Sequence, residues 1–241
     1  MHFDRLQYFF DPLCGWCYAS APALGYLAQH HAEKLELMPS GLFSDEGARD
    51  ITAQWAEYAW SNDQRIASLT GQPFSERYHQ LLLSGTRFDS TFMNRALTRV
   101  RDIGPAAETS LLHMLQHARY VEGRDTSLPD VVEDIVEAWA RENPPGIQHD
   151  RVIMMPDTDE ALRRMTDERI ANVKQRLNQR GLRGVPLLLV TINGHEHIIS
   201  GHDLYGGAQG MRAALDALAK QEASRAERRS TVSPGGLSCQ A

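Results

Sequence analysis

The chain has 241 residues, 42% of them hydrophobic, and a net charge of −6 with a pI near 5.9. This length and composition allow one large core, or a core with a smaller satellite, in a globular protein. No basic block is long enough to follow a phosphate backbone, and no apolar run approaches the length of a bilayer span, so neither nucleic acid nor a membrane is an expected partner. The N-terminus has no signal-peptide pattern, which predicts a cytoplasmic protein.

A CxxC motif, Cys14-Gly15-Trp16-Cys17, lies between an apolar run and a helical pattern over residues 17–31. Two cysteines at this spacing can close a disulfide across one helical turn, and beside a strand-to-helix junction the spacing is typical of a redox pair. A helix N-terminus favours an anion, so Cys14 is the expected nucleophile. Cys17 lies one turn further into the helix, where it is expected to be shielded.

The motif could instead supply half of a zinc site, completed by His195 and His197 or by His202 with Cys239. Structural zinc usually takes a second clustered pair of ligands, and the chain has no second CxxC, so we expect no metal. Purely structural cysteines are the other alternative, although three cysteines cannot form a stapling framework. Cys239 is expected to be an incidental exposed thiol.

Two strand patterns, over residues 6–10 and 35–39, flank the helix of the CxxC motif, and Pro22 is expected to kink that helix. From about residue 45 to residue 143 no strand pattern occurs, and Gly and Pro breakers divide the stretch into helices. These helices are expected near residues 46–60, 74–84, 89–102, 105–121 and 129–142. The aromatic residues of this stretch are interpreted as core rather than binding surface; they include Trp55, Trp60, Phe74, Tyr78, Phe88, Phe92, Tyr120 and Trp139.

A long helix over residues 157–180 leads back to strand patterns. The apolar run that begins at Val185-Pro186 predicts a strand, Asn193-Gly194 predicts a tight hairpin turn, and residues 195–200 form the returning strand. A last helix is expected over residues 203–226. Residues 230–241 have the composition of a frayed tail.

This order of elements resembles the thioredoxin fold, and the helical insertion makes the chain similar to the DsbA family of thiol-disulfide oxidoreductases. The segment Asp11-Pro12-Leu13-Cys14-Gly15-Trp16-Cys17-Tyr18 is similar to the active site of the family's cytosolic FrnE-like branch, and residues 116–125 resemble a segment of its helical domain. The resemblance implies an α/β, thioredoxin-like fold with a large all-helical insertion between strand 2 and the cis-proline strand. The implied thioredoxin-like domain comprises residues 1–44 and 156–229, the insertion residues 45–155, and the tail residues 230–241.

The resemblance also implies roles for single residues. Cys14 and Cys17 would be catalytic, and a cis bond between Val185 and Pro186 would offer the Val185 backbone to the substrate, with Trp16 close by. The residues that would support the motif are Asp11, Pro12, Gly15 and Pro22. DsbA-type oxidases carry a histidine between their cysteines, which Trp16 cannot replace as a charge, so we expect a more reducing disulfide.

Thiol-disulfide exchange, on protein or small-molecule disulfides, is the function that these residues favour. No bound cofactor is implied beyond the redox-active Cys14-Cys17 disulfide, with glutathione as a possible reductant or co-substrate. Glutathione-dependent isomerases and kappa-class glutathione transferases resemble the architecture too, but they have a serine in the active site where this chain has cysteines. A third alternative is that the helical insertion is a docking or chaperone module.

Overall fold

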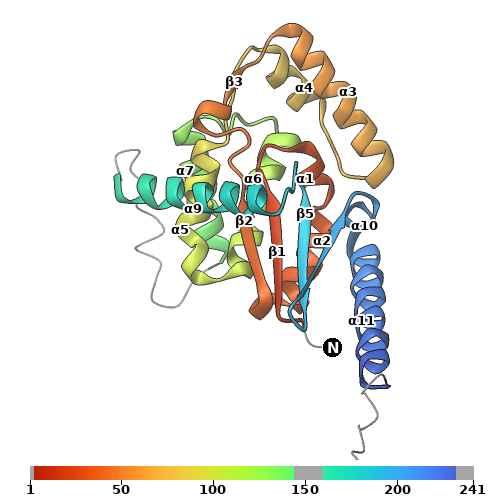
Figure 1. Ribbon diagram of the computed structural model, residues 1–241. Coiled ribbons are helices and arrows are strands. Elements are labelled where there is room, and N and C mark those ends of the chain that lie inside the picture. The colour runs from red at the N-terminus through yellow and green to blue at the C-terminus, as the bar shows by residue number, and fades with distance from the viewer. Residues whose placement is uncertain (1–2, 144–159, 232–241) are drawn as a thin grey trace, which may run out of the picture.

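The computed structural model describes residues 3–143 and 160–231 (Figure 1). Its centre is a four-stranded sheet in the order β2-β1-β5-β6. The strands β1 (Arg5–Phe10) and β2 (Leu35–Pro39) run parallel, whereas β5 (Leu187–Ile192) and β6 (His195–Ser200) are added antiparallel. A parallel pair needs a crossover, and the helices that follow the CxxC motif supply it. This sheet is the α/β core that the resemblance implies.

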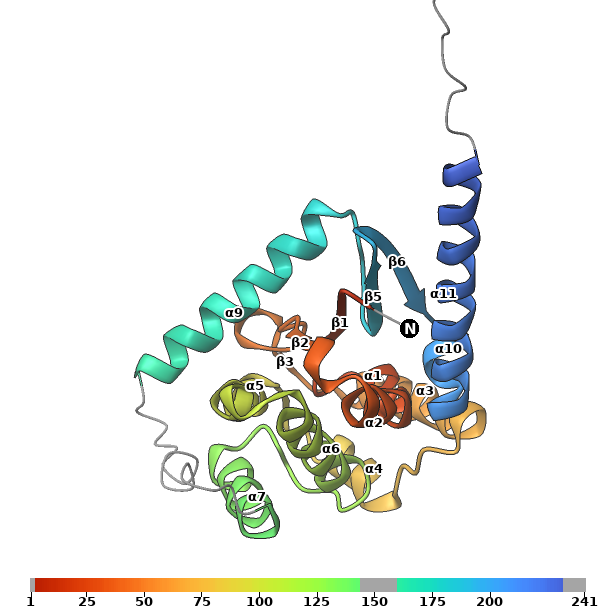
Figure 2. The same ribbon diagram turned by 90° about the horizontal axis from the view of Figure 1, so that it is seen from below.

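Helices cover both faces of the sheet (Figure 2). On one face lie α1 (Gly15–Ala19) and α2 (Ala21–His30), against which α11 (Gly207–Thr231) packs. On the other face α9 (Glu160–Gln179) places Val173 on a small apolar cluster with strand residues such as Phe9 and Leu187. Because helices cover both faces, β1 and β5 are buried along nearly their whole length.

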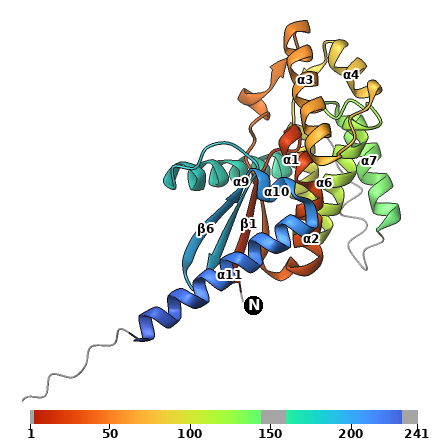
Figure 3. The same ribbon diagram turned by 90° about the vertical axis from the view of Figure 1, so that its right-hand side faces the viewer.

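The helical stretch between β2 and α9 lies beside and above this sheet (Figures 1 and 3). One large buried cluster runs from the strands into these helices, so the described residues of the stretch share a core with the sheet. Whether residues 45–155 form a domain of their own stays a prediction. The helices of this stretch are α3 (Ala53–Thr70), α4 (Glu76–Leu83), α5 (Thr91–Val100), α6 (Pro105–Tyr120) and α7 (Pro129–Glu142), with short 3-10 turns at η2 (Asp45–Gly47) and η3 (Arg101–Ile103). A further 3-10 turn, η1 (Ala32–Lys34), precedes β2.

The first helix predicted for this stretch, over residues 46–60, is wrong in both bounds. The helix α3 begins at Ala53 because the Thr52 side chain accepts a hydrogen bond from the Trp55 backbone N–H at 3.2 Å, and it ends where Gly71 adopts φ 76°. The prediction that this stretch contains no strand is also wrong. β3 (Arg49–Asp50) pairs with β4 (Arg87–Phe88) in a short ladder, which is too brief to produce a periodic pattern.

The predicted helix over residues 203–226 is two helices, α10 (His202–Tyr205) and α11, separated by Gly206, and α11 begins at Gly207 with φ 64°. α11 continues to Thr231, so the first two residues of the predicted tail are helical. The rest of that tail, Cys239 included, lies outside the described residues. The predicted kink is a break at Ser20, and Pro22 occupies the first turn of α2, where no backbone N–H is needed. Within the described ranges, none of the helices combines the length and the apolar character of a membrane span.

Candidate active site

The CxxC motif lies where β1 ends and α1 begins. Cys14 is the N-cap residue of α1, with extended backbone angles, and its side chain is 9% exposed, whereas Cys17 is inside the helix and 2% exposed. Both cysteines are free thiols in this structure. The pair is therefore asymmetric: Cys14 opens to a cavity, and Cys17 lies behind it.

Two backbone groups from distant parts of the chain contact the two sulfurs. Cys14 Sγ donates to the Val185 carbonyl oxygen at 3.7 Å, and the bond between Val185 and Pro186 is cis, as expected from the sequence. Cys17 Sγ accepts from the Asp11 backbone N–H at 3.4 Å. Burial, and then the neighbouring Cys14, raise the pKa of Cys17 well above its usual value, so Cys17 rests as a protonated thiol.

Asp11, predicted only as a support of the motif, is a fully buried junction between three segments. Its carboxylate accepts the backbone N–H of Leu13 at 2.9 Å, the backbone N–H of Phe43 at 3.1 Å and the hydroxyl of Ser90 at 3.1 Å. Burial raises its pKa to about 6, and these three donors oppose that rise. Next to it, the Pro12 carbonyl accepts from Gln116 Nε2 at 3.4 Å, which joins the motif to α6.

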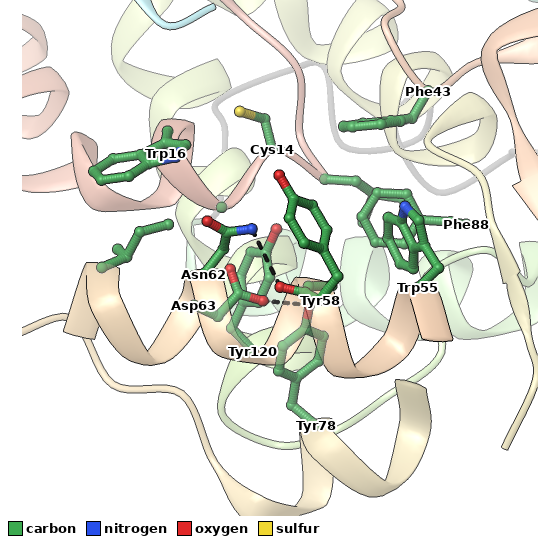
Figure 4. A pocket seen from close by; sticks show the side chains of 14 residues that line it. Cys14, Trp16, Phe43, Trp55, Tyr58, Asn62, Asp63, Tyr78, Phe88 and Tyr120 are labelled. Atoms are coloured by element: carbon green, nitrogen blue, oxygen red, sulfur yellow. Dashed lines mark hydrogen bonds between the residues drawn. The ribbon is translucent and has the colours of Figure 1, made fainter. Parts of the chain in front are cut away.

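A cavity of about 220 Å³ lies between Cys14 and α3 (Figure 4). Four of the eight aromatic residues interpreted as core also line it. Tyr78, Phe88 and Tyr120 are buried members of the hydrophobic core, as predicted, and Trp55 packs partly buried against that core. Periodicity identifies a buried face but does not distinguish a packed core from the wall of a pocket. The cavity is lined by Leu13, Cys14, Gly15, Trp16, Phe43, Trp55, Tyr58, Ala59, Asn62, Asp63, Ile66, Tyr78, Phe88 and Tyr120.

One acid in this aromatic lining, Asp63 on α3, was not singled out from the sequence. Tyr78 Oη donates to Asp63 Oδ2 at 2.9 Å, and the other carboxylate oxygen lies so close to Gly15 that a Cβ there would overlap it. Burial raises the pKa of Asp63 to about 7, while Tyr78 and the buried Arg119 oppose the rise. Gly15 is thus required at its place in the motif by this close approach.

Two arginines stack on aromatic side chains on either side of Cys14. The Arg65 guanidinium lies over the Trp16 ring at 6.0 Å, and that of Arg49 lies over the Phe43 ring at 5.1 Å. Figure 4 shows Cys14 between Trp16 and Phe43. Both arginines are exposed, and neither has an acidic partner within ion-pair distance among the residues that the structure describes.

The histidines considered as zinc ligands do not face the motif. His195 Nδ1 and His197 Nε2 lie 3.3 and 3.2 Å from carboxylate oxygens of Glu222 on α11. Across residues 3–143 and 160–231, no group of three His, Cys, Asp or Glu side chains is arranged to hold a metal ion. Of the other proposed pair, His202 is the first residue of α10, and Cys239 is not among the described residues.

No protein-family model matches the chain, and no curated protein matches it. Among solved structures, it is similar to the cytosolic disulfide reductase DsbM from Pseudomonas aeruginosa, with a TM-score of 0.74 and 25% identity over 90% of this chain and 99% of that one. The resemblance to the DsbA family is confirmed. The similarity to DsbM and to the structures below supports a disulfide oxidoreductase of the DsbA type, its cytosolic branch included.

DsbM has also been solved with glutathione, and that structure matches with a TM-score of 0.72 and 24% identity over 90% of this chain and 99% of that one. A Nitrosomonas europaea protein assigned to the protein disulfide isomerases has a TM-score of 0.70 and 22% identity, over 91% of this chain and 99% of that one. A 2-hydroxychromene-2-carboxylate isomerase shares the fold at a TM-score of 0.51 and 18% identity, over 91% and 98% of the two chains. The α/β fold with a helical insertion is common to all of them.

Proposed function

We propose that this protein is a cytosolic thiol-disulfide oxidoreductase that reduces disulfides, with Cys14 as nucleophile, Cys17 as resolving thiol and glutathione as reductant. The observation that carries the proposal is the asymmetry of the pair. Cys14 faces both the cavity and the Val185 carbonyl, whereas Cys17 is buried behind it with a raised pKa. An attacking thiol that a substrate can reach through a cavity and a protected second thiol are what sequential disulfide exchange requires.

In the proposed cycle, the Cys14 thiolate attacks one sulfur of the substrate disulfide. A Cys14–substrate disulfide forms, and the other half of the substrate leaves as a thiolate that takes up a proton. Cys17 then loses its proton and attacks Cys14 Sγ, which releases the second half of the substrate and closes the Cys14-Cys17 disulfide. Two electrons have passed from the dithiol to the substrate.

Glutathione would return the enzyme to its dithiol form in two exchanges. The first glutathione attacks Cys14 Sγ, which forms a mixed disulfide and frees Cys17. The second attacks the glutathione sulfur of that mixed disulfide, which releases oxidised glutathione and the Cys14 thiol. The glutathione-bound DsbM structure supports this choice of reductant.

The charges around Cys14 also support glutathione. Glutathione carries its thiol in the central residue and a carboxylate at each end. Arg49 and Arg65 stack on Phe43 and Trp16, the two rings between which Figure 4 shows Cys14, and have no acidic partner among the described residues. Guanidinium groups form charge-assisted hydrogen bonds with carboxylates. In the proposed complex, a tripeptide attached to Cys14 would place one carboxylate toward Arg49 and the other toward Arg65.

The cysteine roles are tested with Cys14→Ser and Cys17→Ser, each in a chain with Cys239→Ser. We expect Cys14→Ser to lose all turnover and Cys17→Ser to accumulate the mixed disulfide between Cys14 and the substrate, detected by mass. Full turnover of a small substrate by Cys17→Ser would contradict the proposal and favour a glutathione-conjugate isomerase. Full turnover by Cys14→Ser would overturn it altogether.

The glutathione site is tested with Arg49→Gln and Arg65→Gln. Each is expected to raise the KM for glutathione about threefold and to leave reduction by dithiothreitol unchanged, because dithiothreitol has no carboxylate. Arg87→Gln is the matched control, since Arg87 is also exposed but already pairs with Asp50 and Asp89 at 3.3 Å each. Equal effects of all three substitutions, or equal effects on both thiols, would contradict this part of the proposal.

A further inference from the structure

The floor of the cavity beside Cys14 carries two tyrosine hydroxyls with different surroundings. The hydroxyl of Tyr78 donates to Asp63 Oδ2 at 2.9 Å. The hydroxyl of Tyr120 is buried and has no hydrogen-bond partner among the described residues. A buried hydroxyl without a hydrogen-bond partner lowers the stability of the fold. Such a group beside a reactive sulfur therefore suggests a partner that is present only in another state of the site.

The Tyr120 ring is fixed by its neighbours on several sides. Tyr120 is the last residue of α6, and its ring stacks on Tyr18 at 4.7 Å with an interplanar angle of 17°. It meets Phe74 at 5.1 Å and Tyr78 at 5.0 Å edge to face. Figure 4 shows Tyr120 on the cavity floor below Cys14. The hydroxyl is therefore held in the same cavity as the reactive sulfur.

The Cys14 thiolate of the proposed cycle requires hydrogen-bond donors, and this hydroxyl is one. In the thiol form, Cys14 Sγ donates to the Val185 carbonyl. A thiolate has no proton to donate, so it loses that bond and requires donors instead. Trp16, which stands where DsbA-type oxidases carry a histidine, adds no charge. We propose that the Tyr120 hydroxyl donates a hydrogen bond to the Cys14 thiolate and thereby makes Tyr120 a catalytic residue of disulfide exchange.

Burial raises the pKa of Tyr120 well above its usual value, and the nearby Tyr78 and Asp63 raise it further. The phenol is therefore a neutral O–H donor over the whole working pH range. A hydrogen bond from a neutral donor to an anion is stronger than one between neutral groups. The unpaired hydroxyl would gain its partner only when the thiolate forms, which is the state that the reaction needs to stabilise.

Other ionisable groups around Cys14 do not offer such a donor. Tyr8 on β1 shares a hydrogen bond with Ser20 at 2.6 Å, and Tyr205 on α10 does not line the cavity. Cys17 on α1 lies behind Cys14, and Asp63 on α3, with a pKa raised to about 7, opposes a thiolate whenever it is ionised. The Tyr78 phenol on α4 donates to Asp63, and the Arg65 and Arg49 guanidinium groups lie over Trp16 and Phe43. Tyr58 on α3 also lines the cavity, but it is 67% exposed, whereas Tyr120 is buried.

The test is the pH dependence of Cys14 alkylation by iodoacetamide, followed by mass in chains with Cys239→Ser. Tyr120→Phe removes one oxygen from the cavity floor and is expected to move the midpoint of this dependence up by about one pH unit, a rate loss of about tenfold below the midpoint. Tyr18→Phe is the matched control, because it removes a hydroxyl from the other ring of the same stack, outside the cavity lining. It should leave the midpoint in place.

This inference rests on Cys14 being the nucleophile, but alkylation does not depend on turnover or glutathione, so the two proposals can fail separately. An unchanged midpoint in Tyr120→Phe, or an equal shift in Tyr18→Phe, would overturn the role of Tyr120. If Tyr120→Phe does not fold, NMR of tyrosine-labelled protein decides instead. The Tyr120 ring resonance should titrate together with Cys14 and cease to do so in Cys14→Ser; a resonance that titrates identically in both proteins would overturn the role.

Discussion

Two buried carboxylates lie on either side of the CxxC motif, and their surroundings differ. Asp11 precedes Cys14 and accepts three hydrogen bonds, from Leu13, Phe43 and Ser90. Asp63 reaches the motif from α3, accepts one hydrogen bond from Tyr78, and lines the cavity. Similar burial therefore does not mean similar roles: the carboxylate of Asp11 joins three segments of the chain, whereas that of Asp63 lines the cavity to which Cys14 opens.

The largest effect is expected from removing the first of these acids. Asp11→Ala leaves two backbone N–H groups and the Ser90 hydroxyl without their acceptor, so we expect a loss of about 4 kcal/mol in the free energy of unfolding. Asp63→Ala should cost about 1 kcal/mol or less, since only the Tyr78 hydroxyl loses an acceptor and the cavity admits water. Denaturant unfolding of both reduced variants measures the difference. Equal losses would remove the distinction between the two acids.

The next effect is a pH dependence of stability that comes from Asp63. Its pKa in the folded protein is raised from 3.8 to about 7, so the folded state binds a proton that the unfolded state does not bind between those values. Stability must therefore rise as the pH falls from about 8 toward about 5, by about 3 kcal/mol from this group alone. Asp11 and Glu108, with pKa values raised to about 6 and about 7, add to the trend in the same direction.

Asp63→Asn isolates the contribution of Asp63, because the amide keeps an oxygen for Tyr78 but cannot ionise. The wild type should gain more stability than this variant over the same pH interval, whereas Glu108 and Asp11 contribute equally to both. Unfolding curves at several pH values measure the difference. Parallel pH profiles would show that the pKa of Asp63 is the same in the folded and the unfolded protein.

The smallest effect concerns the contact between Asp63 and the motif. Gly15→Ala introduces a Cβ that would overlap Asp63 Oδ1 and crowd Ile66 Cδ1 at 3.2 Å, so we expect a loss of about 2 kcal/mol in stability. In an Asp63→Ala background the same substitution should cost less, because the carboxylate is gone. A double-mutant cycle measures this coupling. Additive losses would mean that the carboxylate does not restrict residue 15.

The sequence predicted the strands of the central sheet and, through the resemblance to the DsbA family, the role of the Val185-Pro186 bond beside the CxxC motif. The CxxC at a strand-to-helix junction, the Val185-Pro186 pair and the Asn193-Gly194 turn are local signals, and each fixes an element of the sheet. The start of α3 was missed because its cap, Thr52, follows a 3-10 turn and a two-residue strand that carry no period.

The cavity could not be predicted in the same way. Asp63 and Tyr120 come from α3 and α6, and only the packing of those helices beside the motif brings them to Cys14. Along the sequence, Asp63 looks like one polar residue of an amphipathic helix and Tyr120 like a core aromatic. A pattern shows which face of a helix is buried, but the partner across that face depends on tertiary structure.

The redox equilibrium of Cys14 and Cys17 against glutathione buffers shows whether the two cysteines are a redox pair, and it is read by thiol alkylation and mass in a chain with Cys239→Ser. We predict a reversible two-electron transition between a dithiol and a Cys14-Cys17 disulfide, at a potential more reducing than that of the strong DsbA-type oxidases. A pair that forms no reversible disulfide at any ratio of reduced to oxidised glutathione would contradict the account.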